Sequence, residues 1–138
     1  MAKIFHGNVT CMGEKAWSWL VGQPHDFFSI VETHIHDKQS LKKYDGKARG
    51  KGLRLHANPA RRTQHTVADS QVEFASEGGE WFMSKGHLQV ARLSAAKAAA
   101  SKLQAPNHPS SLDGFVAVTA HFAGFSVVIV SFYAHNGV

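Results

Sequence analysis

The sequence predicts an α/β domain with a mixed β-sheet, and three features of the chain carry that prediction. Residues 27–31 form a short apolar run that ends in the carboxylate of Glu32. Residues 4–11 form a second run, which precedes the first by about the length of one helix. Residues 115–122 and 126–133 are two β-branched runs around a Gly-containing turn, a pattern typical of an antiparallel hairpin. We therefore expect two parallel strands joined by a helix, followed by antiparallel strands.

Composition and chain length predict one domain outside the membrane. The chain has 138 residues, 43% of them hydrophobic, which is enough for a single core. Its start lacks the pattern of a signal peptide, and its longest apolar run, near residues 125–133, is shorter than the roughly 20 residues that cross a bilayer. Cys11 is the only cysteine, so neither a disulfide framework nor a thiolate zinc cluster is expected. We expect an intracellular protein, in the nucleus or the cytoplasm, with no membrane partner.

The chain between these runs alternates further predicted elements with loops. Residues 13–21 predict a short helix with apolar side chains at helical spacing, and paired glycines at 78–79 lead into a strand at 80–84. The Ala-rich segment 91–103 predicts a surface helix, and the Pro-containing segment 104–113 predicts a loop. The first helix should cover one face of a single mixed sheet, whose expected strands are residues 3–11, 27–32, 80–85, 115–122 and 126–134.

The most basic part of the chain is residues 42–62, where eight Lys and Arg side chains against one Asp leave a local charge of +7. Residues 38–44 predict a helix that the following glycines end. One interpretation is a phosphate-contacting patch that includes Lys47, Arg49 and Lys51, because Lys and Arg supply the sequence-independent part of nucleic-acid affinity. The other is a solvated loop whose charge serves solubility. The net charge of the whole chain, +5, favours polyanionic partners without specifying one.

Several segments resemble the endonuclease/exonuclease/phosphatase family, which includes apurinic and retrotransposon endonucleases. They are Asn8 near the end of the first run, the Trp-containing helix after it, and residues 26–34. Gly78-Gly79 before a strand and the segment 128–137 are similar to later parts of that domain. The resemblance runs the length of the chain but covers only the N-terminal half of the family's domain. It implies half of a DNase I-like four-layer α/β sandwich, as a partial domain over residues 1–138.

The resemblance also implies roles for four residues. Glu32 falls at the family's metal-binding glutamate and would hold Mg²⁺, or Mn²⁺ in its place. Asn8 and Tyr133 would orient the scissile phosphate, and Asn136 matches a polar position that follows the tyrosine in some relatives, where it would contact substrate. Without the resemblance, Glu32 is a surface carboxylate past a strand end, Asn8 a turn residue and Tyr133 a packed aromatic.

The function implied by the resemblance is that of a Mg²⁺-dependent phosphodiesterase or endonuclease-like domain, with nucleic acid as its phosphoester substrate. The chain departs from the family at Val31, where many relatives have glutamine, and at His135, where proline is frequent. The family's later Asp-x-Asn segment and Asp-His pair are not in this sequence. We therefore expect little or no turnover, and an apolar sheet face that a partner covers. The alternative is a non-catalytic basic module that binds nucleic acid or protein.

Two other arrangements of reactive side chains are present in the sequence. His34 and His36 lie two residues apart in an extended segment, a spacing used in zinc sites, but no third ligand is marked by spacing. Cys11 together with a nearby histidine is a candidate nucleophile pair, without a local motif to support it. The sequence alone does not decide whether either arrangement forms a site.

Overall fold

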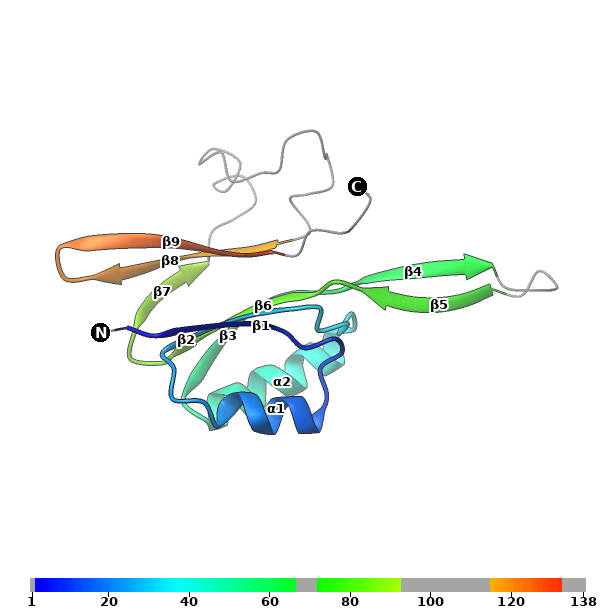
Figure 1. Cartoon of the computed structure of the whole chain (residues 1–138), viewed down its shortest axis with the longest axis horizontal. Helices are drawn as coiled ribbons and strands as arrows, with labels where there is room; N and C mark the ends of the chain where they lie inside the picture. Colours follow the sequence, from blue (N-terminus) through cyan, green and yellow to red (C-terminus); the bar gives the residue numbers. More distant parts are fainter. Residues whose placement is uncertain (1, 67–71, 93–114, 133–138) are drawn as a thin grey trace, which may run out of the picture.

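The computed structural model describes residues 2–66, 72–92 and 115–132, and for residues 63–66 and 72–75 it describes the backbone only. Most of these residues form three layers, which are two helices, a four-stranded sheet and a three-stranded sheet, and a two-stranded ribbon extends beyond them (Figure 1). In chain order the elements are β1 (Ile4–Asn8), α1 (Glu14–Val21), β2 (Phe27–Val31), α2 (Lys38–Gly50), β3 (Leu53–Asn58), β4 (Arg61–Thr66), β5 (Val72–Glu77), β6 (Glu80–Lys85), β7 (Gln89–Arg92), β8 (Phe115–Phe122) and β9 (Phe125–Phe132). Within these ranges, no helix is long and apolar enough to span a membrane.

The four-stranded sheet confirms the predicted α/β class. Its strand order is β1-β2-β6-β3, and β1 and β2 are parallel while the other neighbours are antiparallel. All five residues of β2 are buried, as expected of a continuous apolar run. The strand-helix-strand unit predicted from residues 4–31 is therefore present, with α1 as its crossover.

Each face of this sheet buries its own apolar cluster. Phe28, Ile30 and Trp81 point to one face, where they pack with buried side chains of the two helices, including Trp17 and Tyr44. The other face carries a second cluster formed by Phe27 and Phe82 of the four-stranded sheet with Val116, Val118 and Ala120 of β8. Because side chains of a strand alternate between faces, a strand that is buried at every position, as β2 is, needs a covering layer on both sides.

The terminal hairpin supplies that second layer, and this corrects one prediction. β8 and β9 do pair antiparallel, but they belong to a separate sheet with the order β7-β8-β9 rather than to the same sheet as β1 and β2. The Ser29 hydroxyl donates to the Ser131 hydroxyl across the two layers at 2.8 Å, and both side chains are buried. An alternating apolar run predicts a strand, but it does not identify which sheet the strand joins.

Two helix predictions also need correction. The helix predicted over residues 38–44 continues through Gly46 to Gly50, because Tyr44 and Ala48 are buried against the core and their packing outweighs the cost of the glycine. Most of the basic segment is therefore helix and strand rather than loop. Ala91 lies in β7, so the helix predicted over residues 91–103 does not begin there; its remainder, and the loop predicted at 104–113, lie outside the described residues.

Candidate functional site

The carboxyl ends of β1 and β2 bring Asn8 and Glu32 together, as predicted. Asn8 pairs in register with Val31, the residue before Glu32. The Asn8 amide donates from Nδ2 to Glu32 Oε2 at 3.1 Å. Asn8 Oδ1 accepts from the backbone N–H of Thr10 at 2.9 Å and from its hydroxyl at 3.0 Å. Both ends of the amide are therefore engaged, which fixes its orientation toward the carboxylate.

The backbone around this pair is held in an unfavourable conformation. Four residues that are not glycine have positive φ: Thr10 (43°), Cys11 (82°), Glu32 (56°) and His34 (58°). Such residues cost of order 1–3 kcal/mol each and are concentrated at functional sites. Cross-strand hydrogen bonds hold them, since the Cys11 N–H donates to the Glu32 carbonyl at 2.9 Å and the His34 N–H to the Gly78 carbonyl at 2.9 Å. Sequence patterns gave no sign of this strain.

Gly78 and Gly79 complete the edge of the sheet where β6 begins. Their φ angles are +72° and +89°, which favour glycine, and the Gly79 carbonyl accepts from the Thr33 N–H at 3.1 Å. A Cβ at Gly79 would collide with the Thr33 hydroxyl and lie 3.2 Å from the Cβ of Ala60. The glycine pair leads into a strand, as predicted, and at Gly79 the neighbouring chain approaches too closely for a side chain. We call Asn8, Glu32, Gly79, Glu80 and the backbone that joins them the rim.

Glu80 is a rim residue whose place in the sequence predicts only the start of a strand. Its side chain is 4% exposed, and the Asn58 amide donates to Glu80 Oε2 at 3.1 Å. Burial raises the pKa of Glu80 to about 7, because a carboxylate in an apolar layer loses its hydration. In the sequence, the only indication of a special role for Glu80 is its position between paired glycines and an apolar run. Its burial depends on how the layers of the fold pack, which the local sequence does not show.

The two histidines at the end of β2 do not converge. His34 Nδ1 lies 2.9 Å from the Cys11 sulfur, whereas His36 Nδ1 lies 2.8 Å from the Ser76 hydroxyl. Among the residues that the structure describes, no group of three His, Cys, Asp or Glu side chains is placed to hold a metal ion. The two imidazoles therefore face different partners rather than one zinc ion.

Two predicted site residues, Tyr133 and Asn136, lie outside the described residues. The described part of β9 ends at Phe132, one residue beyond the Ser131 hydroxyl that bonds to Ser29 of β2. Their assignment as phosphate-contacting residues therefore stays a prediction.

The basic residues predicted to bind substrate lie in the helix layer, and two of them are ion-paired. Lys47 Nζ lies 2.6 Å from both carboxylate oxygens of Glu14, and Arg49 Nε lies 3.1 Å from Asp45 Oδ2. The hydrogen bond from Lys47, supported by one from Lys43, lowers the pKa of Glu14 below its usual range. These cations are exposed or partly exposed, so a polyanion would compete with the carboxylates for them.

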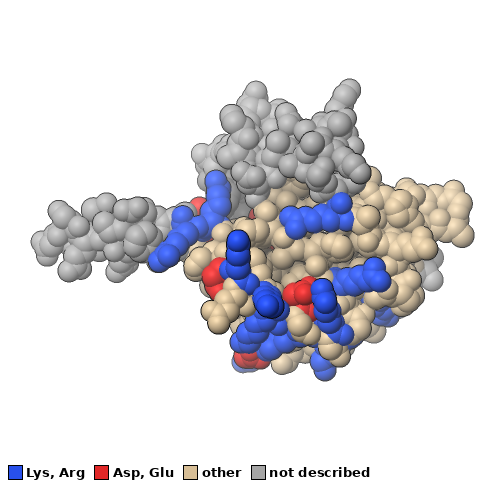
Figure 2. Space-filling view, turned by 180° about the vertical axis from the view of Figure 1, so that it is seen from behind, with Lys and Arg blue, Asp and Glu red and all other residues tan. Residues whose placement is uncertain are grey.

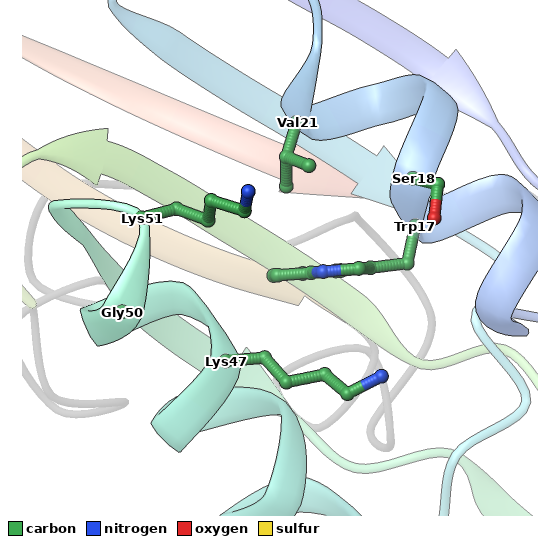
Figure 3. Close-up of a pocket in the computed structure, with 6 residues that line it drawn as sticks. All are labelled: Trp17, Ser18, Val21, Lys47, Gly50 and Lys51. Atoms are coloured by element: carbon green, nitrogen blue, oxygen red, sulfur yellow. The ribbon is translucent and has the colours of Figure 1, made fainter.

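Lys47 and Lys51 line an open groove between α1 and α2, with a volume of about 410 Å³. Figure 3 shows the Trp17 ring lying between these two lysine side chains. We call this hollow the helix groove; its lining residues are Trp17, Ser18, Val21, Lys47, Gly50 and Lys51. Figure 2 shows Lys and Arg side chains spread over one face of the molecule, with few acidic side chains among them.

The end of the helix groove and the rim lie toward opposite ends of the four-stranded sheet. Lys51 leads into Leu53, which pairs with Lys85 at the end of β6 that is distant from Glu80. The five steps along β6 from Lys85 to Glu80 separate these ends by about 16 Å, at roughly 3.3 Å per residue. Lys51 therefore cannot contact the same phosphate group as Glu32.

Comparison of the chain with protein-family models, with curated proteins and with solved structures found no match. The resemblance described above thus rests on the residues that carry it.

Proposed function

We propose that the rim is the metal-binding part of a Mg²⁺-dependent phosphodiesterase, with nucleic acid as the substrate class. The observation that carries the proposal is the hydrogen bond between Asn8 and Glu32 at the carboxyl ends of two parallel strands. Ligands of open α/β sheets gather at such strand ends. Backbone strain at Glu32 adds support, because it is maintained by cross-strand bonds rather than relaxed.

The donor set of the rim fits Mg²⁺ or Mn²⁺ better than a softer metal. Mg²⁺ takes one or two carboxylates and completes its shell with phosphate oxygens and waters, and Glu32 offers one partly exposed carboxylate. When bound, the ion would supply positive charge to a scissile phosphate. Glu32 would hold it, and the Asn8 amide keeps that carboxylate in one orientation. Tyr133 and Asn136 are proposed to hydrogen-bond the phosphate.

The test uses metal binding together with cleavage, because turnover by this chain is expected to be slow. Titration of Mn²⁺ followed by calorimetry should show binding to the wild type and its loss in Glu32→Gln. Cleavage of a labelled DNA strand should require Mg²⁺ or Mn²⁺, stop with EDTA and disappear in the same variant. Glu77→Gln is the matched control, since Glu77 is an exposed glutamate that ends β5 and does not belong to the strand ends of β1 and β2. Equal metal binding by Glu32→Gln and the wild type would reject the proposal.

A second candidate is a basic module that binds nucleic acid without cleaving it. It is favoured by the cationic face in Figure 2 and by the lysines that line the helix groove. Point charges on flexible stems contact the phosphate backbone rather than base edges, so this function predicts sequence-independent binding that weakens with salt. Binding without metal-dependent cleavage would favour this candidate over the first.

A further inference from the structure

Among the residues that the structure describes, β9 is an edge strand of the three-stranded sheet. In the described part of the chain, β9 pairs with β8 on one side and with no strand on the other. Its eight residues, Phe125–Phe132, contain no charge and no proline, the features by which natural proteins block further pairing at an edge. Phe125, Val127, Val128 and Phe132 are 39–60% exposed. A long, uncharged and apolar edge of this kind is a template for another strand.

The four-stranded sheet that packs against β9 extends one strand further than β9 does. β9 packs over β2 and β6, and β1 is the outer neighbour of β2. The three-stranded sheet therefore covers β2 but not its parallel neighbour β1. Phe27, Ser29 and Val31 of β2 are buried, whereas their partners Ile4, His6 and Asn8 on the same face of β1 are exposed. We call these three β1 side chains the shelf.

The shelf admits one strand but not another copy of this fold. A second copy that paired its own β9 with this edge would bring its β2-β6 layer to the position that β1 and β2 already occupy. A single extended segment brings no such layer. It would complete backbone hydrogen bonds with β9 and cover the shelf with every second side chain.

We propose that β9 and the shelf bind one extended strand of a partner protein, uncharged and with apolar side chains at alternating positions. The shelf and β9 carry no carboxylate or ammonium group of their own, so a charged side chain over Ile4 or His6 would lose hydration without gaining an ion pair there. The side chain of the added strand that lies over Ile4 should be apolar. His6, whose Nδ1 lies 2.9 Å from the Ser29 hydroxyl, accommodates a small hydrogen-bonding one. The site shares Asn8 with the rim, but strand binding here needs no metal ion and does not depend on the metal chemistry proposed there.

The probe is a ten-residue peptide of alternating Thr and Val, kept soluble by a polyethylene glycol tail. Calorimetry should show binding to the wild-type chain, and hydrogen exchange should slow at β9 amides when the peptide is present. Ile4→Lys should weaken binding about tenfold or more, because it places a charge under the added strand. Trp19→Lys is the matched control, since Trp19 is 58% exposed on α1 and Ile4 is 50% exposed on the shelf.

Three results would overturn the proposal. The first is no peptide binding by a folded wild-type chain, with its fold verified by circular dichroism. The second is equal weakening by Ile4→Lys and Trp19→Lys, which would reflect added charge anywhere on the surface. The third is a dimer in sedimentation experiments that Val128→Lys abolishes, which would assign the edge to a second copy of this chain.

Discussion

The rim and the helix groove both carry charged side chains, but these side chains are held in place by different forces. At the rim, backbone hydrogen bonds between β1, β2 and the start of β6 hold Glu32 in a strained conformation. At the helix groove, Lys47 is positioned by exposed Glu14, a contact between two side chains in water. Water and salt weaken the second kind of contact and hardly reach the first. The rim is therefore preorganised, whereas the groove can rearrange around a ligand.

The largest expected effect comes from filling the space at Gly79. Gly79→Ala places a methyl group against the Thr33 hydroxyl at a positive φ, so it should lower the free energy of unfolding by about 3 kcal/mol or more. Urea denaturation measures the loss. Gly46→Ala is the control, because no atom lies within 4 Å of its added Cβ, and in a helix it should instead stabilise by about 0.5–1 kcal/mol. A neutral Gly79→Ala would mean that the rim is as adaptable as the groove.

The next largest effect is a pH dependence that originates at Glu80. Its folded-state pKa of about 7 exceeds the ordinary value of 4.5, so the folded protein binds more protons between these pH values. The stability contributed by the neutral acid is complete below pH 4.5 and is lost as pH rises to 7, by roughly 3 kcal/mol in total. Glu80→Gln should therefore gain stability over the wild type as pH rises from 5 to 8.

Denaturation curves at pH 5, 6, 7 and 8 isolate this effect as the difference between the two proteins. Burial lowers the pKa of His56, which gives a slope of opposite sign below pH 6.5, but wild type and variant share it. Glu77→Gln, at an exposed site, should follow the wild-type curve. Parallel curves for Glu80→Gln and wild type would show that Glu80 is hydrated in solution.

The contrast between the rim and the helix groove also explains which features could be predicted from the sequence. The adjacency of Asn8 and Glu32 was predictable, because a strand-helix-strand unit aligns the ends of its strands whatever the rest of the fold does. The burial of Glu80 was not, because it depends on layers whose assignment comes from tertiary packing. The same holds for α2, where Tyr44 and Ala48 carry the helix through Gly46. Local patterns predicted β1, α1, β2, β6, β8 and β9, while the packing of the layers set the length of α2 and determined which polar groups lost water.

The smallest expected effect tests whether the lysines of the helix groove, together with Arg49 beside them on α2, bind polyanions. Replacing Lys47, Arg49 and Lys51 by Ala should flatten the dependence of log affinity on log salt for duplex DNA, by up to roughly 0.9 for each phosphate contact removed. Lys47 and Arg49 already pair with Glu14 and Asp45, so each should contribute less to the change in slope than Lys51 does. Fluorescence anisotropy from 50 to 200 mM salt gives the slope.

A second triple variant separates location from charge. Lys3, Lys15 and Lys38 replaced by Ala remove the same formal charge at sites outside the helix groove. If the groove contacts phosphates, only the first triple variant should lower the slope, and both should stay folded because none of the six side chains is in the core. Equal salt slopes in the two triple variants would mean that the basic segment contributes only net charge and no specific phosphate contacts. Nucleic acid would then remain a proposed partner of the rim alone, where Glu32 is held by the backbone and does not depend on those lysines.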